Sequence, residues 1–430
     1  MAGLAAARAL TTAGARVSIF DARDRVGGRV WTIRDGFASG QHAEGGADII
    51  ESDQSAVMSL VRELKLPIVP ILQDGFGFYG TGANGRLGVR TGSRNMSALF
   101  APFWSAVAQY RLLEGRWHGP LAQAIARESV AEYLKRTGAT AETVARLRSL
   151  RGFFLADPED LSMIALLDFL ATDGFGGDGG MFRVKGGNDL MATRMAAQLA
   201  SPVRLKAVLR RVHQTDRRVT VTVEDARGLH EITADALIIA MPATAVRDVV
   251  FAPGLPDAQR HAVDTLKYGG ATRVLLQFAS RFWVRAGRPR AFGSDLTTGA
   301  VWDGNEHQRG PAGILSLLAG GRASDALVAL LNRQGAEGIA ERLRWLGRPA
   351  RLVASHIVRW NDDPWVGGGY AVFDPAFDPA GRDWLARPSG RISFAGEHTS
   401  VRWQGYMTGA LETGRRAARE VLLGAGLNYY

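Results

Sequence analysis

The hydrophobic pattern near the start of the chain predicts a helix followed by a short strand. Residues 4–12 are rich in alanine and contain no helix breaker, and Gly14 stands where a left-handed glycine would end the helix. Residues 17–20 then form a short, mostly apolar run that ends at Asp21, as expected for a strand.

Further along the chain, three segments show strand patterns and one shows a helical pattern. Residues 218–223 alternate between polar and apolar side chains, which predicts a half-buried strand. Residues 237–240, just before Pro242, are uniformly apolar, which predicts a fully buried strand, and residues 391–395 predict another. From Gly405 onward, small and apolar side chains recur at helical spacing: Met407, Ala410, Leu411, Gly414, Ala417, Ala418, Val421 and Leu422.

A helix, a glycine, a short strand and an acid form the second half of a βαβ dinucleotide-binding unit. There the helix N-terminus faces the pyrophosphate, and a carboxylate ~20 residues past the glycines binds the ribose. Gly3 stands 18 positions before Asp21, in the place of the last glycine of G-x-G-x-x-G. An ordinary surface helix before a strand would give the same half motif. Only Met1 and Ala2 precede Gly3, so we expect the first strand and the other glycines upstream, lost through a misplaced start codon or trimming.

Two adjacent glycines flanked by arginines follow this unit. Gly27 and Gly28 would let the main chain pass close to a ligand, while Arg23 and Arg29 offer paired donors to phosphate. A Gly-Gly turn between solvated arginines is the alternative. The position just after Asp21 favours a phosphate-binding loop.

Composition narrows the classes of protein. With 430 residues and 46% hydrophobic content, the chain is too long for one core, so two interlocked domains are expected. The absence of cysteine excludes disulfides, thiolate metal sites, cysteine nucleophiles and cysteinyl-linked cofactors. The net charge of +10 comes from scattered arginines rather than a basic cluster, which argues against nucleic-acid binding. No run approaches the ~18 apolar residues of a membrane-spanning helix.

Four short blocks combine glycines with charged residues: residues 21–32, 43–47, 182–190, and 394–399 followed by 405–410. Together they resemble the flavin-containing monoamine oxidase superfamily, which includes monoamine oxidases, polyamine oxidases and L-amino-acid oxidases. The resemblance implies an α/β fold, with a Rossmann-like FAD-binding domain, incomplete at its N-terminus, interleaved with an α+β substrate-binding domain. It places the FAD-binding domain in residues 1–55, 183–252 and 387–424, and the substrate-binding domain in residues 56–182 and 253–386.

The resemblance also assigns cofactor roles to individual residues. Asp21 takes the place of the ribose-binding acid, Arg29 that of the arginine on the pyrophosphate, and Val208 that of the residue whose backbone meets the adenine. Residues 45–46 match the stretch beside the isoalloxazine, and Glu397 matches the acid of the ribityl or pyrophosphate region. Strand packing at Val208 and a helix-flanking charge at Glu397 are the alternatives. The predicted cofactor-binding set is Gly3, Asp21, Arg23, Gly28, Arg29, Gly45, Gly46, Val208, Trp360, Gly396, Glu397, Gly405 and Met407.

The last of these blocks also has a physical basis. Gly405 and Gly409 would leave one face of the first helical turn without side chains. Free N–H groups and a partial positive charge would then face the edge of a reduced, anionic flavin. A packed helix explains the apolar stripe but not the paired glycines.

In the family that the sequence resembles, the flavin performs the oxidation. A hydride passes from the carbon beside the substrate nitrogen to flavin N5, and O2 reoxidises the flavin to give hydrogen peroxide. Tyr370 and Tyr406 match the family's aromatic cage around the substrate nitrogen, and packing of two core rings is the alternative. Gly369 stands where some monoamine oxidases carry the cysteine that bonds the flavin, so we expect non-covalent FAD.

Two positions depart from the family pattern. Arg273, the third residue of the predicted catalytic set with Tyr370 and Tyr406, aligns with the lysine that promotes reaction with O2. Arginine does not deprotonate in the working range, so oxygen reactivity is expected to be low unless another residue holds the water. Asp48 lies near the place of the arginine that binds the carboxylate in L-amino-acid oxidases, and it would repel one. The predicted substrate is therefore a primary or secondary amine, for instance a polyamine or an arylalkylamine.

The sequence thus predicts an FAD-dependent amine oxidase that acts on a small-molecule amine, with O2 or another electron acceptor. A related flavin dehydrogenase or desaturase with a different acceptor is one alternative, and a flavin-free binding or scaffold relative is another. We expect no metal, because the eight histidines lack ligand spacing. A cytoplasmic location is expected because no export signal is visible, and a homodimer is left open.

Overall fold

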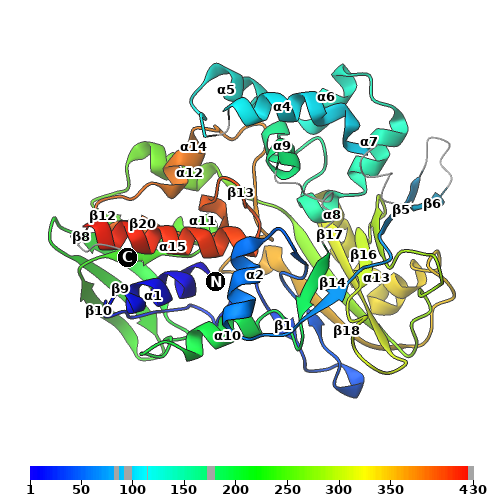
Figure 1. Ribbon diagram of the computed structural model, residues 1–430, viewed down its shortest axis with the longest axis horizontal. Helices are drawn as coiled ribbons and strands as arrows, with labels where there is room; N and C mark the ends of the chain where they lie inside the picture. Colours follow the sequence, from blue (N-terminus) through cyan, green and yellow to red (C-terminus); the bar gives the residue numbers. More distant parts are fainter. Residues whose placement is uncertain (82–86, 92–98, 114, 172–179, 425–430) are drawn as a thin grey trace.

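The computed structural model describes residues 1–81, 87–91, 99–113, 115–171 and 180–424 (Figure 1). In this view the first and last helices, α1 (Ala2–Thr12) and α15 (Met407–Gly424), lie on the left, a group of helices lies across the top, and a large sheet lies on the right. Residues from all three parts line one large cavity.

The left part is built around α1 and α15, which pack against each other. Gly414 permits this contact, because a Cβ atom there would lie 2.2 Å from the carbonyl oxygen of Ala2. Next to them, β11 (Leu237–Ile239) runs parallel to β20 (Ile392–Phe394). A separate sheet has the order β10-β9-β8-β12, with β8 (Val208–Gln214), β9 (Val219–Asp225), β10 (Gly228–Ala234) and β12 (Val250–Ala252).

The right part is a seven-stranded sheet in the order β18-β14-β17-β16-β15-β5-β6. Even-numbered residues of β14, such as Val274 and Leu276, pack with the helix α13 (Arg322–Glu341). Because side chains alternate along a strand, Arg273 lies on the opposite face. The strands are β5 (Phe76–Thr81), β6 (Leu87–Thr91), β14 (Ala271–Phe278), β15 (Ala291–Ser294), β16 (Ala300–Asp303), β17 (Gly313–Gly320) and β18 (Leu352–Arg359).

The helices across the top of Figure 1 share an apolar core in which Tyr110 and Trp117 are fully buried. A capping box fixes the start of one of them, since Ser129 and Glu132 bond to each other's backbone N–H groups. These helices are α4 (Trp104–Leu113), α5 (Pro120–Arg127), α6 (Val130–Arg136), α7 (Ala141–Arg148), α8 (Arg151–Phe154) and α9 (Met163–Ala171).

Smaller elements connect the three parts. The helices are α2 (Ser55–Glu63), α10 (Leu190–Ala197), α11 (Ala243–Val246), α12 (Asp257–Thr265) and α14 (Gly381–Ala386). A three-stranded sheet joins β3 (Ile50–Glu51), β7 (Met181–Val184) and β4 (Ile68–Ile71). Two short pairs are β1 (Thr32–Ile33) with β2 (Ala43–Glu44), and β13 (Lys267–Tyr268) with β19 (Ala371–Val372).

Most of the elements expected from the sequence are confirmed. The helix at residues 4–12 is part of α1, and Gly14 follows it with φ +82°. The strands predicted at 218–223, 237–240 and 391–395 are β9, β11 and β20. The strand predicted at residues 17–20 is not formed as an extended strand: only Phe20 bridges Arg204, because the hydrogen bonds of this segment run to residues 204–207 on one side.

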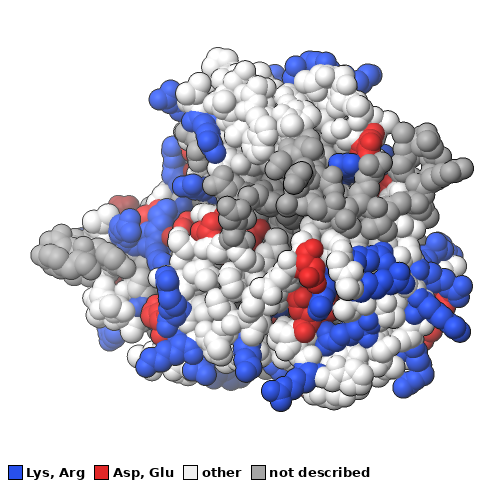
Figure 2. Space-filling view, turned by 45° about the vertical axis from the view of Figure 1, so that its right-hand side comes forward, with Lys and Arg blue, Asp and Glu red and all other residues white. Residues whose placement is uncertain are grey.

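The surface carries charges of both signs. On the face shown in Figure 2, Lys and Arg side chains are spread over several places and interleaved with Asp and Glu. Arg136 pairs with Glu128 and Arg210 with Glu224, for example. In the described part of the chain, no helix is both long and apolar enough to cross a bilayer. The two domain ranges given above stay a prediction.

Candidate active site

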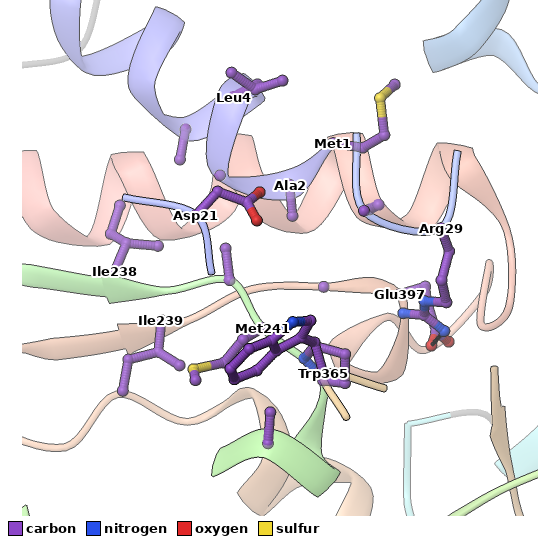
Figure 3. A pocket seen from close by; sticks show the side chains of 18 of the residues that line it. Met1, Ala2, Leu4, Asp21, Arg29, Ile238, Ile239, Met241, Trp365 and Glu397 are labelled. Atoms are coloured by element: carbon purple, nitrogen blue, oxygen red, sulfur yellow. Dashed lines mark hydrogen bonds and ion pairs between the residues drawn. The ribbon is translucent and has the colours of Figure 1, made fainter. Parts of the chain in front are cut away.

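A cavity of about 1830 Å³ runs between the parts described above. Ligand pockets typically measure ~300–1,000 Å³, so this cavity has room for a large cofactor together with a substrate. Figure 3 shows part of it, with Leu4 of α1, Ile238 of β11 and Glu397 among the side chains around the space. Every residue predicted from the sequence for the cofactor or for catalysis lines this cavity, except Gly45.

The start of α1 and the residue Asp21 form one part of the wall. A Cβ atom on Gly3 would lie 3.4 Å from that of Ala240, so the glycine allows close packing of the helix against the segment after β11. Asp21 accepts a hydrogen bond from the backbone N–H of Arg23 at 2.9 Å, and burial raises the pKa of this carboxyl. The second carboxylate oxygen of Asp21 has no hydrogen-bond partner among the described residues. It can therefore accept hydrogen bonds from a ligand.

The Gly-Gly loop after Asp21 has the conformation that close approach of a ligand requires. Gly27 and Gly28 have φ +99° and +61°, and a Cβ atom on Gly28 would meet open space. Arg23 does not present a free fork to this space, because both of its terminal nitrogens donate to Asp363 at 2.7 Å. Of the two predicted phosphate donors, Arg29 is thus the better placed to reach a pyrophosphate.

Arg29, which is half-buried, and the buried Glu397 form an ion pair at 2.7 Å. The same nitrogen of Arg29 donates to the carbonyl of Gly369 at 2.7 Å, while Glu397 also accepts from the backbone N–H of Gly405 at 2.8 Å. Burial alone would raise the pKa of Glu397, but the neighbouring Arg29 outweighs it and the pKa is lowered. Glu397 therefore fixes the turn that precedes α15, and its oxygens are engaged by the protein itself.

The first turn of α15 differs from the bare face expected from its glycines. Gly405 has φ +80° and lines the cavity, together with Tyr406 and Met407. Gly409 instead faces the protein, since a Cβ atom there would lie 2.1 Å from the carbonyl oxygen of Trp403. The prediction that Gly409 opens the helix end toward a ligand is therefore wrong, because the preceding turn fills that space.

The two tyrosines of the predicted cage come from separate segments. Tyr370 donates its hydroxyl to the carbonyl of Phe153, and a Cβ atom on Gly405 would lie 3.2 Å from its ring. Tyr406 packs edge-on against Trp403, with ring centroids 5.4 Å apart. Burial raises the pKa of both hydroxyls, so both stay protonated at neutral pH. Their role around a substrate nitrogen stays a prediction.

The remaining predicted residues support the wall in different ways. Val208 begins β8 and Gly396 follows β20, both at the cavity. Gly46 cannot carry a side chain, because its Cβ would lie 1.8 Å from the carbonyl oxygen of Arg29. Gly45 lies behind the wall, where its carbonyl accepts a hydrogen bond from the indole of Trp360 at 3.1 Å.

Arg273 is held in the wall by a buried cluster. Its Nη1 donates to Asp48 at 3.1 Å and to Ser316 at 2.8 Å. The other oxygen of Asp48 accepts from Arg183, and the indole of Trp302 donates to Asp48 at 2.8 Å. The expectation that Asp48 repels a substrate carboxylate is therefore wrong, because its charge is compensated by two guanidinium groups.

Sequence reasoning did not single out two polar residues at the cavity wall near the predicted cage, Glu51 and Gln54. Glu51, whose charge acts on Tyr406, accepts from the side-chain amide of Gln54 at 3.3 Å. The amide oxygen of Gln54 is buried and has no hydrogen-bond partner among the described residues. No sequence motif identifies Glu51 and Gln54, because their importance comes from the cavity beside them.

Comparison with known proteins identifies the family. Residues 1–422 match the family described as flavin containing amine oxidoreductase. The chain belongs to this family. It is 28% identical over 438 residues to a putative flavin-containing monoamine oxidase, AofH, of Mycobacterium tuberculosis, covering 98% of this chain and 94% of the relative. It is also 28% identical over 465 residues to an L-amino-acid oxidase of Siganus canaliculatus, covering 100% of this chain and 85% of that protein.

Two solved structures share its fold. Cyclohexylamine oxidase from Brevibacterium oxydans superposes with a TM-score of 0.86 at 23% identity, covering 99% of this chain and 97% of the other. A putrescine oxidase double mutant superposes with a TM-score of 0.85 at 24% identity, covering 98% and 97%. These findings confirm the amine-oxidase fold and the family inferred from the four sequence blocks. The protein is an FAD-dependent amine oxidase, and the alternative of a flavin-free relative is set aside.

Proposed function

We propose that this enzyme oxidises the C–N bond of a small primary or secondary amine and passes the electrons to O2. The amine would become an imine, which hydrolyses to a carbonyl compound, and O2 would become hydrogen peroxide. One observation carries the proposal: a single cavity is lined both by the loop at Asp21 and Gly28 and by Tyr370 and Tyr406. A cofactor and a substrate can therefore meet in one shared cavity.

The cofactor part of the cavity fits FAD in its chemistry. The unengaged oxygen of Asp21 suits ribose hydroxyls, and the open space at Gly28 suits a phosphate passing close to the backbone. Arg29 supplies positive charge next to this space, held in place by Glu397. When bound there, FAD accepts the hydride from the carbon beside the substrate nitrogen.

The substrate part is lined by aromatic and aliphatic side chains that exclude water, together with a few polar groups. Tyr370 and Tyr406 would orient the amine, because two π-faces guide a nitrogen and tolerate different substituents. Glu51 offers a carboxylate at the cavity, and no described residue forms an ion pair with it, which suits an N–H donor such as an amine. The preference for amines therefore rests on Glu51 and no longer on Asp48.

A dehydrogenase that uses another electron acceptor is the second candidate. Arg273 favours it, because a guanidinium bound to Asp48 and Ser316 does not release a proton at neutral pH. Such an enzyme would oxidise the same amines but would react slowly with O2.

Anaerobic titration of the purified yellow protein with amines, followed by admission of air, separates these possibilities. We expect amines to bleach the flavin absorbance and air to restore it, with one hydrogen peroxide formed per amine oxidised. Bleaching without recovery in air would support the dehydrogenase. Bleaching by L-amino acids and not by any amine of a broad panel would overturn the proposed substrate class.

A variant tests Glu51 separately. Glu51→Gln removes the negative charge at the cavity and should raise KM for amines about tenfold while changing kcat less. The matched control is Glu63→Gln on α2, where the exposed carboxylate pairs with Arg8 at the surface. Equal KM values for both variants and the parent enzyme would remove Glu51 from the amine site.

A further inference from the structure

The cluster around Asp48 joins three parts of the chain inside the protein. Arg183 comes from β7, Arg273 from β14 and Trp302 from β16, and all three donate to the same carboxylate. The side chains of Arg183, Asp48 and Arg273 are 2%, 4% and 5% exposed. Burial alone would raise the pKa of Asp48, but the two guanidinium groups outweigh it and lower the pKa.

This cluster carries one more positive charge than negative charge. The nearby acids are already paired elsewhere, since Asp303 pairs with Arg281 at 3.3 Å and Glu306 with Arg290 at 3.7 Å. Among the described residues, the remaining acidic neighbour is Glu44, whose pKa is raised to about 8 by burial and by Asp48, so that it is mostly protonated at neutral pH. The excess charge therefore belongs to the two arginines that share Asp48.

Arg273 presents this charge to the cavity. Arg273, Asp48 and Trp302 line the cavity, whereas Arg183 is not among the described residues that do. The guanidinium of Arg273 lies over the Trp302 ring at 4.8 Å, and its Nε is buried without a hydrogen-bond partner in the described part of the chain. Two buried bonds from Nη1 fix the group, so it cannot turn away to water.

We propose that Asp48 is a positioning residue that sets the charge of the cavity wall, and that the resulting excess of one positive charge raises the reduction potential of the bound flavin. Taking up two electrons and one proton gives the flavin one additional negative charge. A fixed positive charge buried in the cavity wall stabilises that product more than the oxidised form. The inference rests on the proposed function only in that the flavin binds in this cavity, and it needs no particular amine.

Two substitutions within the cluster should move the potential in opposite directions. Asp48→Asn increases the excess from one positive charge to two, so the potential should rise. Arg273→Gln reduces the excess to zero, so the potential should fall. If the cluster only stabilised the fold, both substitutions would shift the reduction potential of the flavin in the same direction or not at all. The matched control is Arg136→Gln, which removes an exposed arginine that pairs with Glu128 and is not among the described residues lining the cavity.

The experiment is a reductive titration of each holoenzyme against a reference dye, without any amine substrate. Sulfite, an anion that adds to oxidised flavin, gives a second readout, with binding expected to be roughly tenfold tighter in Asp48→Asn and tenfold weaker in Arg273→Gln. If Asp48→Asn does not fold, Arg273→Lys and Arg273→Met are compared instead. Arg273→Lys keeps the positive charge and should keep the reduction potential, whereas Arg273→Met removes the charge and should lower the potential. Shifts of the same sign, or equal potentials for lysine and methionine, would overturn the inference, whatever the substrate proves to be.

Discussion

We expect the parent protein to lose stability as the pH rises toward 8 because Glu44 must ionise, and replacing Glu44 by glutamine should remove this loss. Glu44 is 3% exposed, and burial, followed by the charge of Asp48, raises its pKa from 4.5 to about 8. Because the pKa is raised in the folded state, the stabilising contribution is complete below about pH 4.5 and is lost as the pH rises to about 8. At ~1.4 kcal/mol per pH unit, this amounts to about 5 kcal/mol across that window.

Glutamine resembles the protonated carboxyl and can keep both hydrogen bonds of Glu44. At this position the side chain bonds to the hydroxyl of Thr32 at 2.8 Å and to the backbone N–H of Asn188 at 3.0 Å. A glutamine oxygen can accept from Asn188, and its amide nitrogen can donate to Thr32. The variant should therefore fold, and the difference in stability should grow in its favour with pH.

Urea unfolding measured between about pH 5 and about pH 8 tests this, because the midpoint reports stability when the slope is unchanged. The matched control is Glu231→Gln, which removes an exposed carboxyl on β10. We expect the control to follow the parent protein at every pH, while Glu44→Gln diverges from it steadily. A Glu44→Gln curve that stays parallel to that of the parent would refute the idea that Glu44 is buried in its neutral form.

Three further predictions follow from the cavity wall. Gly46→Ala should give little folded, flavin-containing protein, because the added Cβ would lie 1.8 Å from the carbonyl oxygen of Arg29. The control Gly254→Ala adds a Cβ where the space is open and should show the normal flavin absorbance. Glu397→Gln should weaken FAD retention about tenfold on gel filtration, because Arg29 and the Gly405 turn lose their anionic partner; full retention would contradict this. Acid precipitation should release all the flavin into the supernatant, because the chain has no cysteine, and yellow colour left in the pellet would disprove non-covalent binding.

Local signals predicted much of the fold from the sequence. Three elements that bury one face against a neighbour were predicted in this way and are confirmed. They are the helix at residues 4–12, the strand β9 and the helix α15. The segment at residues 17–20 was predicted less well, because an extended strand needs partners along its length, and only residues 204–207 supply them.

The sequence predicted which residues lie at the candidate site, but not which of them form ion pairs with one another. Motif spacing brought Asp21, Arg29 and Glu397 to one cavity, because glycines and charges around a ligand must keep a fixed order along the chain. The pairing of Arg23 with Asp363 and that of Asp48 with Arg183 could not be predicted in this way. Each pair joins residues far apart in the sequence, and which charges compensate one another is decided only by the packing of strands and loops.

The contact between α1 and α15 has a consequence for how the enzyme is made. The cavity wall takes Gly3 from the first helix and Met407 from the last, and Glu397 fixes the turn between β20 and α15. On a ribosome the cofactor loop at Asp21 is synthesised nearly 400 residues before that helix. The chain therefore cannot complete this wall until α15 has been synthesised, and flavin uptake is expected as a late step of folding.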